Sequence, residues 1–237
     1  MKKILLLFIV LLTFVKSYSQ TSVFNNLLEK YVTNTGIVDY ERFNGQLLKK
    51  HIKYLENTST KSNWSDNKQK AFWINVYNAY TIYIVLNTIQ IEKIESVLDI
   101  KIKGKTAWKI PFVKVGNKTY TLDYIEHKIL RRKFSDPKIH FGINCASASC
   151  PKLSNKAFTE ENIEMELTRL TEDFINDTSK NKISNNEIEI SLIFDWFQND
   201  FTKNGSLINF LNNYSKIKIS PKAKISFLNY DWTLNRK

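Results

Sequence analysis

The chain has 237 residues, of which 43% are hydrophobic and 24% are charged, and its formal net charge is +12 at pH 7. This length is typical of one large domain or two small ones. The lysines are scattered among acidic residues, with only short groups such as Arg131-Arg132-Lys133. Because a nucleic-acid groove needs a basic stripe with stacking aromatics, we expect no nucleic-acid partner.

Residues 1–19 have the features of a secretory signal peptide. Two lysines precede the apolar run Ile4–Val15, and Ser17 and Ser19 supply the small residues that a signal peptidase needs before Gln20. The run is too short to span a bilayer comfortably, and no nearby cysteine could take a lipid anchor. We therefore expect an exported protein, periplasmic or extracellular, with no stable membrane anchor after cleavage. Its partner would be an unknown substrate or envelope component.

Three segments of the N-terminal half carry apolar residues at helical spacing and are predicted helices: Val23–Val32, Glu41–Leu55 and Asp66–Thr88. Ser65 is the expected N-cap of the third helix. The central sequence of that helix, AFWINVYNAYTIYIVL, is apolar on nearly every side. We therefore expect it to be the buried centre of the domain.

A β-hairpin is predicted next, because WKIPFVKV and KTYTL are joined by the two-residue turn Gly116-Asn117. Helical spacing recurs over Leu122–Lys133, from a Thr159 cap to about Asn176, and over Leu207–Tyr214. Strand-like runs are Lys138–Asn144, Glu187–Ile193 and Lys224–Trp232.

The order of these elements predicts an α+β fold. Residues 20–237 show no linker and no internal repeat, so we expect a single domain. Its helical N-terminal half would contain the long buried helix, and a mainly antiparallel sheet would lie in the C-terminal half.

Most of the reactive side chains lie in the segment Ile139–Pro151. This segment reads IHFGINCASASCP and holds both cysteines and one of the three histidines. The predicted strand leads into a loop of Ala and Ser, whose small side chains permit close approach by a substrate. Because an unperturbed thiol is only about a few per cent thiolate at neutral pH, a catalytic cysteine needs a nearby base, cation or helix N-terminus.

His140 and His127 are the candidate bases for Cys145. His140 precedes Cys145 by five positions, and His127 follows Glu126 on a predicted helix. A carboxylate could orient either imidazole. The candidate carboxylates are Asp123, Glu126, Asp195 and Asp200, and spacing alone does not choose among them.

Two other interpretations stay open. In the first, Cys145 and Cys150 form a disulfide, which oxidising compartments favour, and the bridge shapes the recognition loop of a non-catalytic binding or structural domain. In the second, His127, His140 and the two cysteines form a tetrahedral zinc site, although their spacing is wider than that of a usual zinc knuckle. The leading interpretation requires no metal and no other cofactor.

Asn75 and Asn78 stand out in the long apolar helix. A buried amide must find hydrogen-bond partners, so we expect both side chains to hold the backbone of a neighbouring loop. The aromatic residues at helical spacing, Trp73 and Tyr77 among them, are more typical of a core than of a ligand groove.

The chain resembles the domain of unknown function 547 family. The matching pieces are Val38-Asp39-Tyr40, AFWINVYNAYTI, LDYIEHKILR, DPKIHFGINCASASCP, FDWFQNDF and YDWTLN. The resemblance implies one continuous domain. It also carries over, as signature positions without assigned roles, Trp73, Asn75, Tyr77, Asn78, Glu126, His127, His140, Asn144, Cys145, Ser149 and Cys150.

The leading hypothesis is a thiol-dependent hydrolase or acyl transferase that acts on an envelope or extracellular substrate. Cys145 would attack as a thiolate activated by His140 or His127 and form an acyl-enzyme, while backbone N–H groups of Ala146–Ser149 stabilise the oxyanion. Glu126 would orient a base. The residues expected to bind substrate or support the site are Asn75, Asn78, Asn144, Ser149, Cys150, Trp73 and Tyr77.

Overall fold

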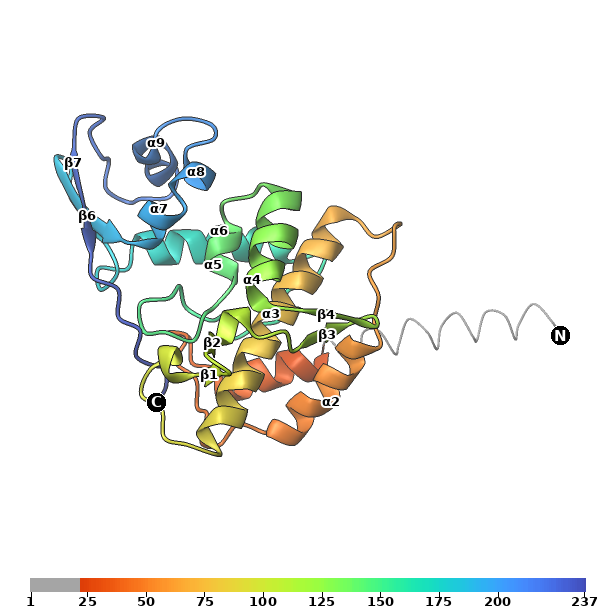
Figure 1. The fold of residues 1–237 in the computed structure, drawn as a ribbon. Coiled ribbons are helices and arrows are strands. Elements are labelled where there is room, and N and C mark those ends of the chain that lie inside the picture. Colours follow the sequence, from red (N-terminus) through yellow and green to blue (C-terminus); the bar gives the residue numbers. More distant parts are fainter. Residues whose placement is uncertain (1–21) are drawn as a thin grey trace.

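Helix α3 (Asp66–Ile89) forms the buried centre of the fold. The computed structural model describes residues 22–237 (Figure 1). The Ser65 hydroxyl caps α3 by accepting a hydrogen bond from the backbone N–H of Lys68 at 3.2 Å. Because the helix is apolar on nearly every side, it is stable in water only when other elements cover all of its faces. The predicted capped and buried helix is confirmed.

The other helical elements lie before and after α3 in the chain, and several of them pack against it. A further helix covers residues 22–31. Helix α2 begins at Gly45, later than predicted, because the Asn44 side chain caps it. The elements are α2 (Gly45–Glu56), η1 (Val97–Asp99), η2 (Ala107–Lys109), α4 (Leu122–Tyr124), η3 (Ile125–Phe134), α5 (Ile139–Gly142), α6 (Ile163–Ile175), α7 (Ile193–Trp196), α8 (Gln198–Phe201) and α9 (Leu207–Asn212).

Elements α4 and η3 together form the helix predicted over Leu122–Lys133. Unexpectedly, η3 is a π-helix, a wider form. Such helices are rare in proteins, and those that occur are often found at functional sites. It contacts α3 and carries Glu126, His127 and Arg131. The helix ends at Phe134, and the following residue, Ser135, has a φ of 52° in the left-handed region.

Within residues 22–237 the strands form three small sheets. Strands β1 (Lys101–Ile102) and β2 (Lys105–Thr106) pair antiparallel, as do β3 (Val113–Val115) and β4 (Lys118–Tyr120). The third sheet has the order β5 (Lys182–Ile183), β6 (Glu187–Ser191), β7 (Lys224–Leu228).

The predicted β-hairpin at Gly116-Asn117 is confirmed, and both turn residues have positive φ, as a type I′ turn requires. The α+β class is also confirmed. Most strand pairs are antiparallel, but β6 and β7 run parallel, with Glu187 opposite Lys224. In Figure 1 this sheet and helices α7–α9 lie together at one end of the molecule.

The strand predicted over Lys138–Asn144 is wrong. Residues Ile139–Gly142 form the one-turn helix α5, and Ile143 after it is extended. Ile139 and Phe141 are both fully buried. A short apolar run buried on all sides has no periodicity that separates a strand from a helix. Gly142 lets α5 pack closely on α6, because a Cβ at that position would collide with the Leu167 side chain.

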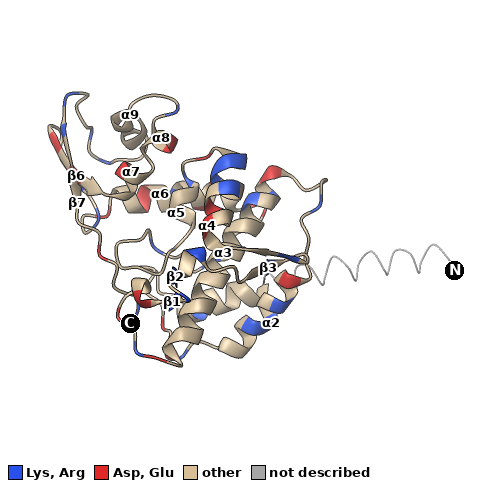
Figure 2. Cartoon of the chain, viewed as in Figure 1, with Lys and Arg blue, Asp and Glu red and all other residues tan. Residues whose placement is uncertain are grey.

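Within residues 22–237, none of the helices has the length and apolar character needed to cross a bilayer. The predicted signal peptide, residues 1–19, lies outside the described residues. Figure 2 shows basic positions spread over many elements, with acidic positions among them.

Candidate functional site

A cavity of about 190 Å³ brings together most of the reactive residues predicted from the sequence. Helix η3 contributes Glu126 and His127, helix α5 contributes His140, and the following loop contributes Cys145 and Cys150. The cavity is lined by Tyr77, Trp108, Asp123, Glu126, His127, His140, Ile143, Cys145, Cys150, Pro151, Ile193, Trp196, Phe197, Tyr230 and Trp232.

The loop that carries the cysteines is held by buried amides. Asn78 in α3 donates to the carbonyl of Gly142 at 2.9 Å and accepts from the backbone N–H of Asn144 at 2.9 Å. Asn144 in turn donates to the carbonyl of Pro151 at 2.8 Å and accepts from the N–H of Ala146 at 2.9 Å. The expectation that Asn78 holds a neighbouring loop is confirmed, and Asn144 clamps both ends of that loop.

Replacing Asn144 by alanine is expected to destabilise the fold by about 2–4 kcal/mol, because several buried backbone groups would lose their partners. Chemical denaturation followed by circular dichroism measures the change. The half-buried Asn155, whose amide donates to the Asn34 side chain, is the control, and Asn155→Ala should change stability by less than about 0.5 kcal/mol. Equal effects of the two substitutions would contradict a clamping role for Asn144.

The two cysteines are adjacent but not bonded. Their sulfurs lie 2.9 Å apart, and both thiols are free. A disulfide requires about 2.05 Å, so the bridge considered from the sequence is not formed in this structure. The Cys145 sulfur also lies 3.0 Å from the Ser147 hydroxyl and 3.4 Å from the Tyr230 hydroxyl.

These neighbouring groups give the two thiols different pKa values. A hydrogen bond from Cys150 lowers the pKa of Cys145 to about 6, with the Ser147 and Tyr230 hydroxyls acting in the same direction against burial. Burial raises the pKa of Cys150, and the nearby Cys145 charge adds to that shift. At neutral pH, Cys145 is therefore the thiolate and Cys150 the hydrogen-bond donor.

An organic disulfide such as oxidised glutathione is expected to close a bridge between the two sulfurs. The Cys145 thiolate attacks one sulfur and releases a thiolate, and Cys150 then loses its proton and displaces the second thiol. Intact mass should show the loss of two hydrogen atoms, and iodoacetamide should no longer label Cys145 until a reductant is added. Cys150→Ser should instead stop at a mixed disulfide on Cys145, and an unchanged wild-type mass would refute the exchange.

The predicted oxyanion donors are largely occupied, which corrects the sequence-based assignment. The N–H groups of Ala146, Ala148 and Ser149 already donate elsewhere. Their acceptors are, in that order, the Asn144 side chain at 2.9 Å, the Thr233 carbonyl at 2.7 Å and the Asp231 carbonyl at 3.1 Å. The C-terminal segment that contains Asp231 and Thr233 packs against this loop. The N–H groups of the loop therefore donate to that segment or to Asn144 instead of facing the cavity.

Glu126 is a buried carboxyl whose acidity is strongly perturbed. Its Oε2 accepts a hydrogen bond from the Tyr77 hydroxyl at 3.2 Å. Burial raises the pKa of Glu126 to about 7, and the negative charge of Cys145 adds to the shift. A carboxyl with this pKa is protonated often enough near neutral pH to donate a proton to a reacting group.

His140 is oriented by Asp200, a contact that chooses among the carboxylates proposed from the sequence. Its Nε2 lies 2.8 Å from Asp200 Oδ2, which also accepts from Arg131 Nε at 2.6 Å. Burial alone would raise the pKa of Asp200, but the hydrogen bonds from His140 and Arg131 hold it well below its usual range. An ionised Asp200 keeps the His140 proton on Nε2 and leaves the Nδ1 lone pair as the basic atom.

The surroundings of His140 keep the ring neutral and fixed. Its ring stacks on Phe197, with centroids 4.2 Å apart. Burial lowers the pKa of His140, while the bond to Asp200 opposes the shift. A neutral imidazole with a free Nδ1 can accept a proton, as a general base requires.

His127 has a different role open to it. Its Nδ1 lies 2.9 Å from Arg131 Nη1, and a guanidinium can only donate. Burial and the Arg131 charge lower the pKa of His127. The neutral ring therefore carries its proton on Nε2, so that atom is a hydrogen-bond donor and not a base. His127 fits stabilisation of developing negative charge better than proton abstraction.

The remaining predicted site residues do not line the cavity. Asn75 donates to the carbonyl of Phe158 and accepts from its N–H, as expected for an amide that holds a loop. Trp73 is buried against Phe72 and Tyr120 and does not line the cavity. The Ser149 hydroxyl accepts from the backbone N–H of Asp231 at 2.9 Å.

Sequence reasoning missed several residues of the site. Arg131 lies one helical turn after His127, and that spacing was the available signal. Tyr230 lies in the YDWTLN motif, but nothing local indicates that its hydroxyl meets a sulfur far away in the chain. Within residues 22–237, no group of three or more His, Cys, Asp or Glu side chains is placed to hold a metal ion, so the zinc interpretation gains no support.

Comparison with known proteins identifies one relationship. The family model described as "Protein of unknown function, DUF547" matches residues 61–175. This region includes α3, η3, α5 and the cysteine loop. No curated protein and no solved structure matches the chain.

Proposed function

We propose that this chain, whose residues 61–175 belong to the DUF547 family, is a thiol-dependent hydrolase or acyl transferase. The observation that carries the proposal is the Cys145 sulfur, placed within hydrogen-bond distance of Cys150, Ser147 and Tyr230 beside a cavity. We further propose that the protein is exported, on the basis of residues 1–19, and acts on an envelope or extracellular substrate.

Cys145 is the proposed nucleophile. Its thiolate attacks the substrate carbonyl carbon, and a thioester to the enzyme forms as the leaving group departs. Since neighbouring hydrogen bonds already favour the thiolate, the first step needs no histidine to remove the thiol proton. This differs from the activation by His140 or His127 that the sequence suggested.

Glu126 is the proposed general acid for the leaving group. The charge on Cys145 helps to hold the Glu126 proton in place, and acylation removes that charge. The pKa of Glu126 must then fall, which favours transfer of the proton to the departing oxygen or nitrogen. The acid is therefore strongest at the step that needs it.

His140 is the proposed general base for deacylation. With Nε2 directed to Asp200, Nδ1 is the atom available to take a proton from water or from an acceptor alcohol. The activated oxygen then attacks the thioester and releases Cys145 as a thiolate.

Trapping of the acyl-enzyme tests the proposal directly. The protein is mixed with excess p-nitrophenyl acetate, quenched with acid at successive times and analysed by intact mass and peptide mapping. We expect an acetyl group on Cys145 that appears with a burst of p-nitrophenol and decays when ester is exhausted. Steady release of p-nitrophenol with no adduct on Cys145, or no release above the buffer rate, would refute the proposal.

For an alkyl ester such as ethyl acetate, whose alkoxide leaves only with a proton, the pH dependence of kcat/KM should be bell-shaped, with its maximum between about pH 6 and 7. Activity rises as Cys145 loses its proton around pH 6 and falls as Glu126 loses its proton around pH 7. Glu126→Gln should remove the alkaline fall and lower the maximum by about 10²-fold or more. The exposed Glu172 is the matched control, and a wild-type profile in Glu126→Gln would exclude Glu126 as the acid.

A further inference from the structure

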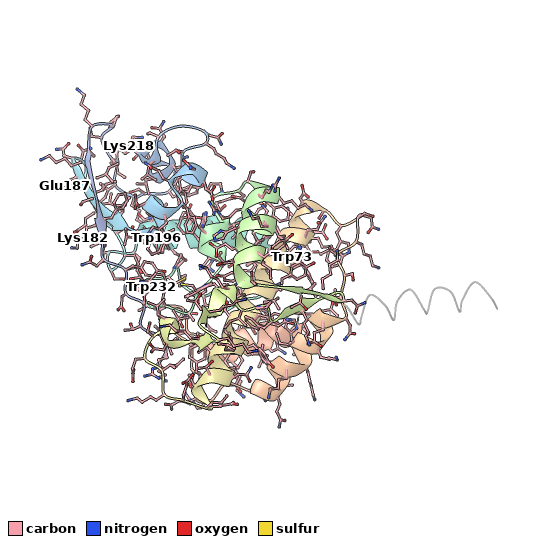
Figure 3. All side chains as sticks on the ribbon, viewed as in Figure 1. Trp73, Lys182, Glu187, Trp196, Lys218 and Trp232 are labelled. Carbon is pink, nitrogen blue, oxygen red and sulfur yellow. The ribbon has the colours of Figure 1, made fainter. Side chains whose placement is uncertain are left out.

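Four aromatic residues of the cavity form a continuous group, here called the aromatic wall: Trp108, Trp196, Tyr230 and Trp232. Trp196 and Trp232 stack with centroids 5.7 Å apart, and both contact Tyr230, at 4.8 and 4.5 Å. Trp108 meets the edge of Trp232 at 6.0 Å. Figure 3 shows Trp196 and Trp232 close together and far from Trp73, which belongs to the core.

Core packing does not fully explain the aromatic wall, although Trp108, Tyr230 and Trp232 are half-buried against the core. Trp196 is 44% exposed, whereas the core tryptophan Trp73 is 6% exposed. Three separate parts of the chain, η2, α7 and the C-terminal segment, converge to build the wall. Exposed aromatic surface of this kind, inside a concave site, is typical of ligand contact.

The wall is also preorganised. The Ser96 hydroxyl donates to the carbonyl of Trp232 at 2.8 Å, and the N–H of Val97 donates to the same carbonyl at 3.3 Å. The neighbouring Asp231 N–H donates to Ser149. Because these bonds fix the backbone between the aromatic rings, little ordering is required when a ligand binds.

The wall begins at the nucleophile. The Tyr230 hydroxyl lies 3.4 Å from the Cys145 sulfur, and the Tyr230 ring contacts Trp196 and Trp232. An acyl group transferred to Cys145 would therefore extend along these rings. The other lining residues include the carboxyl groups of Asp123 and Glu126, which disfavour an acyl group with its own negative charge.

The volume of the cavity indicates the size of the group that its walls can surround. A cavity of about 150 Å³ with apolar walls takes one benzene ring, and this cavity measures about 190 Å³. We infer that the aromatic wall is the acyl-binding surface and that the substrate is an uncharged ester or thioester of a flat, apolar acid about the size of benzoic acid. This inference rests on the proposed acyl transfer to Cys145.

A matched series of p-nitrophenyl esters tests the inference, because all share one leaving group. The acetate, butyrate, benzoate and hemisuccinate are compared, each corrected for its hydroxide-catalysed rate. We expect kcat/KM for the benzoate to exceed that for the acetate by about 10-fold or more, and the hemisuccinate to fall below the butyrate. Equal corrected values for acetate and benzoate, or a preferred hemisuccinate, would overturn the inference.

Two substitutions locate the effect. Trp196→Ala should lower the benzoate-to-acetate ratio of kcat/KM about 10-fold, since it removes exposed apolar surface worth about that much binding. Trp64→Ala, at a tryptophan packed on Phe72 outside the cavity, should leave the ratio unchanged. An unchanged ratio in Trp196→Ala would show that the wall does not select the acyl group.

A binding measurement separates this inference from the proposed catalysis. Calorimetry with the Cys145→Ala protein should give tighter binding of benzamide than of acetamide by about 10-fold, and Trp196→Ala should abolish the difference. If benzamide binds in this way and no ester is hydrolysed, acyl transfer fails while the apolar ligand class stands. If neither amide is preferred, the inference fails whatever the esters show.

Discussion

Replacement of Cys145 by serine is expected to lower kcat for ester hydrolysis by at least about 10⁴-fold. A serine hydroxyl keeps its proton at neutral pH, and the hydrogen bonds that favour the Cys145 thiolate cannot ionise it. No other described residue supplies a nucleophile of comparable acidity at the cavity, because burial keeps Cys150 protonated. Steady-state rates with p-nitrophenyl acetate measure the change.

Labelling with iodoacetamide provides the second readout for Cys145→Ser. The wild type should be alkylated at Cys145 with a rate that follows deprotonation around pH 6, and the variant should not be labelled in the folded state. Thermal unfolding checks that the nearly isosteric change leaves the fold intact. If the variant retained more than a hundredth of wild-type turnover, Cys145 would not be the nucleophile.

Replacement of Asp200 by asparagine is expected to lower kcat/KM by about 10³–10⁴-fold. Asp200 is a positioning residue: its charge holds the His140 proton on Nε2, and an amide in its place can donate to that nitrogen and reverse the tautomer. The substitution also removes the ion pair between Asp200 and Arg131. Because Arg131 contacts His127 as well, the orientation of His127 should change too.

A specific pattern separates this role from a structural one. In Asp200→Asn, deacylation should be slowed most, so the acetyl group on Cys145 accumulates, while alkylation by iodoacetamide falls far less. Asp195→Asn, an exposed acid on the adjacent helix α7, should behave as the wild type. Loss of alkylation and turnover in equal measure would indicate a disturbed fold instead of a disturbed base.

The elements predicted best are those whose signals are local. Ser65 followed by a long apolar run was enough for α3, and the Gly116-Asn117 pair was enough for the hairpin, because capping and turn conformation depend on a few neighbouring residues. The failure at Lys138–Asn144 has the opposite cause. Residues 139–144 are buried by α6 and other distant elements, so no exposed polar face indicates the local conformation.

The sequence by itself determined the α+β class, the family resemblance and the residue types of the site. It placed Cys145, His140 and Glu126 among the candidates because reactive side chains are few and lie close together in the chain. Only the tertiary structure decided their roles. Asp200 and Tyr230 reach the site through long-range packing, and their contacts, with those of Arg131, set which thiol ionises and which histidine nitrogen holds a proton. Protonation is fixed by distances and burial in three dimensions, which spacing along the chain does not encode.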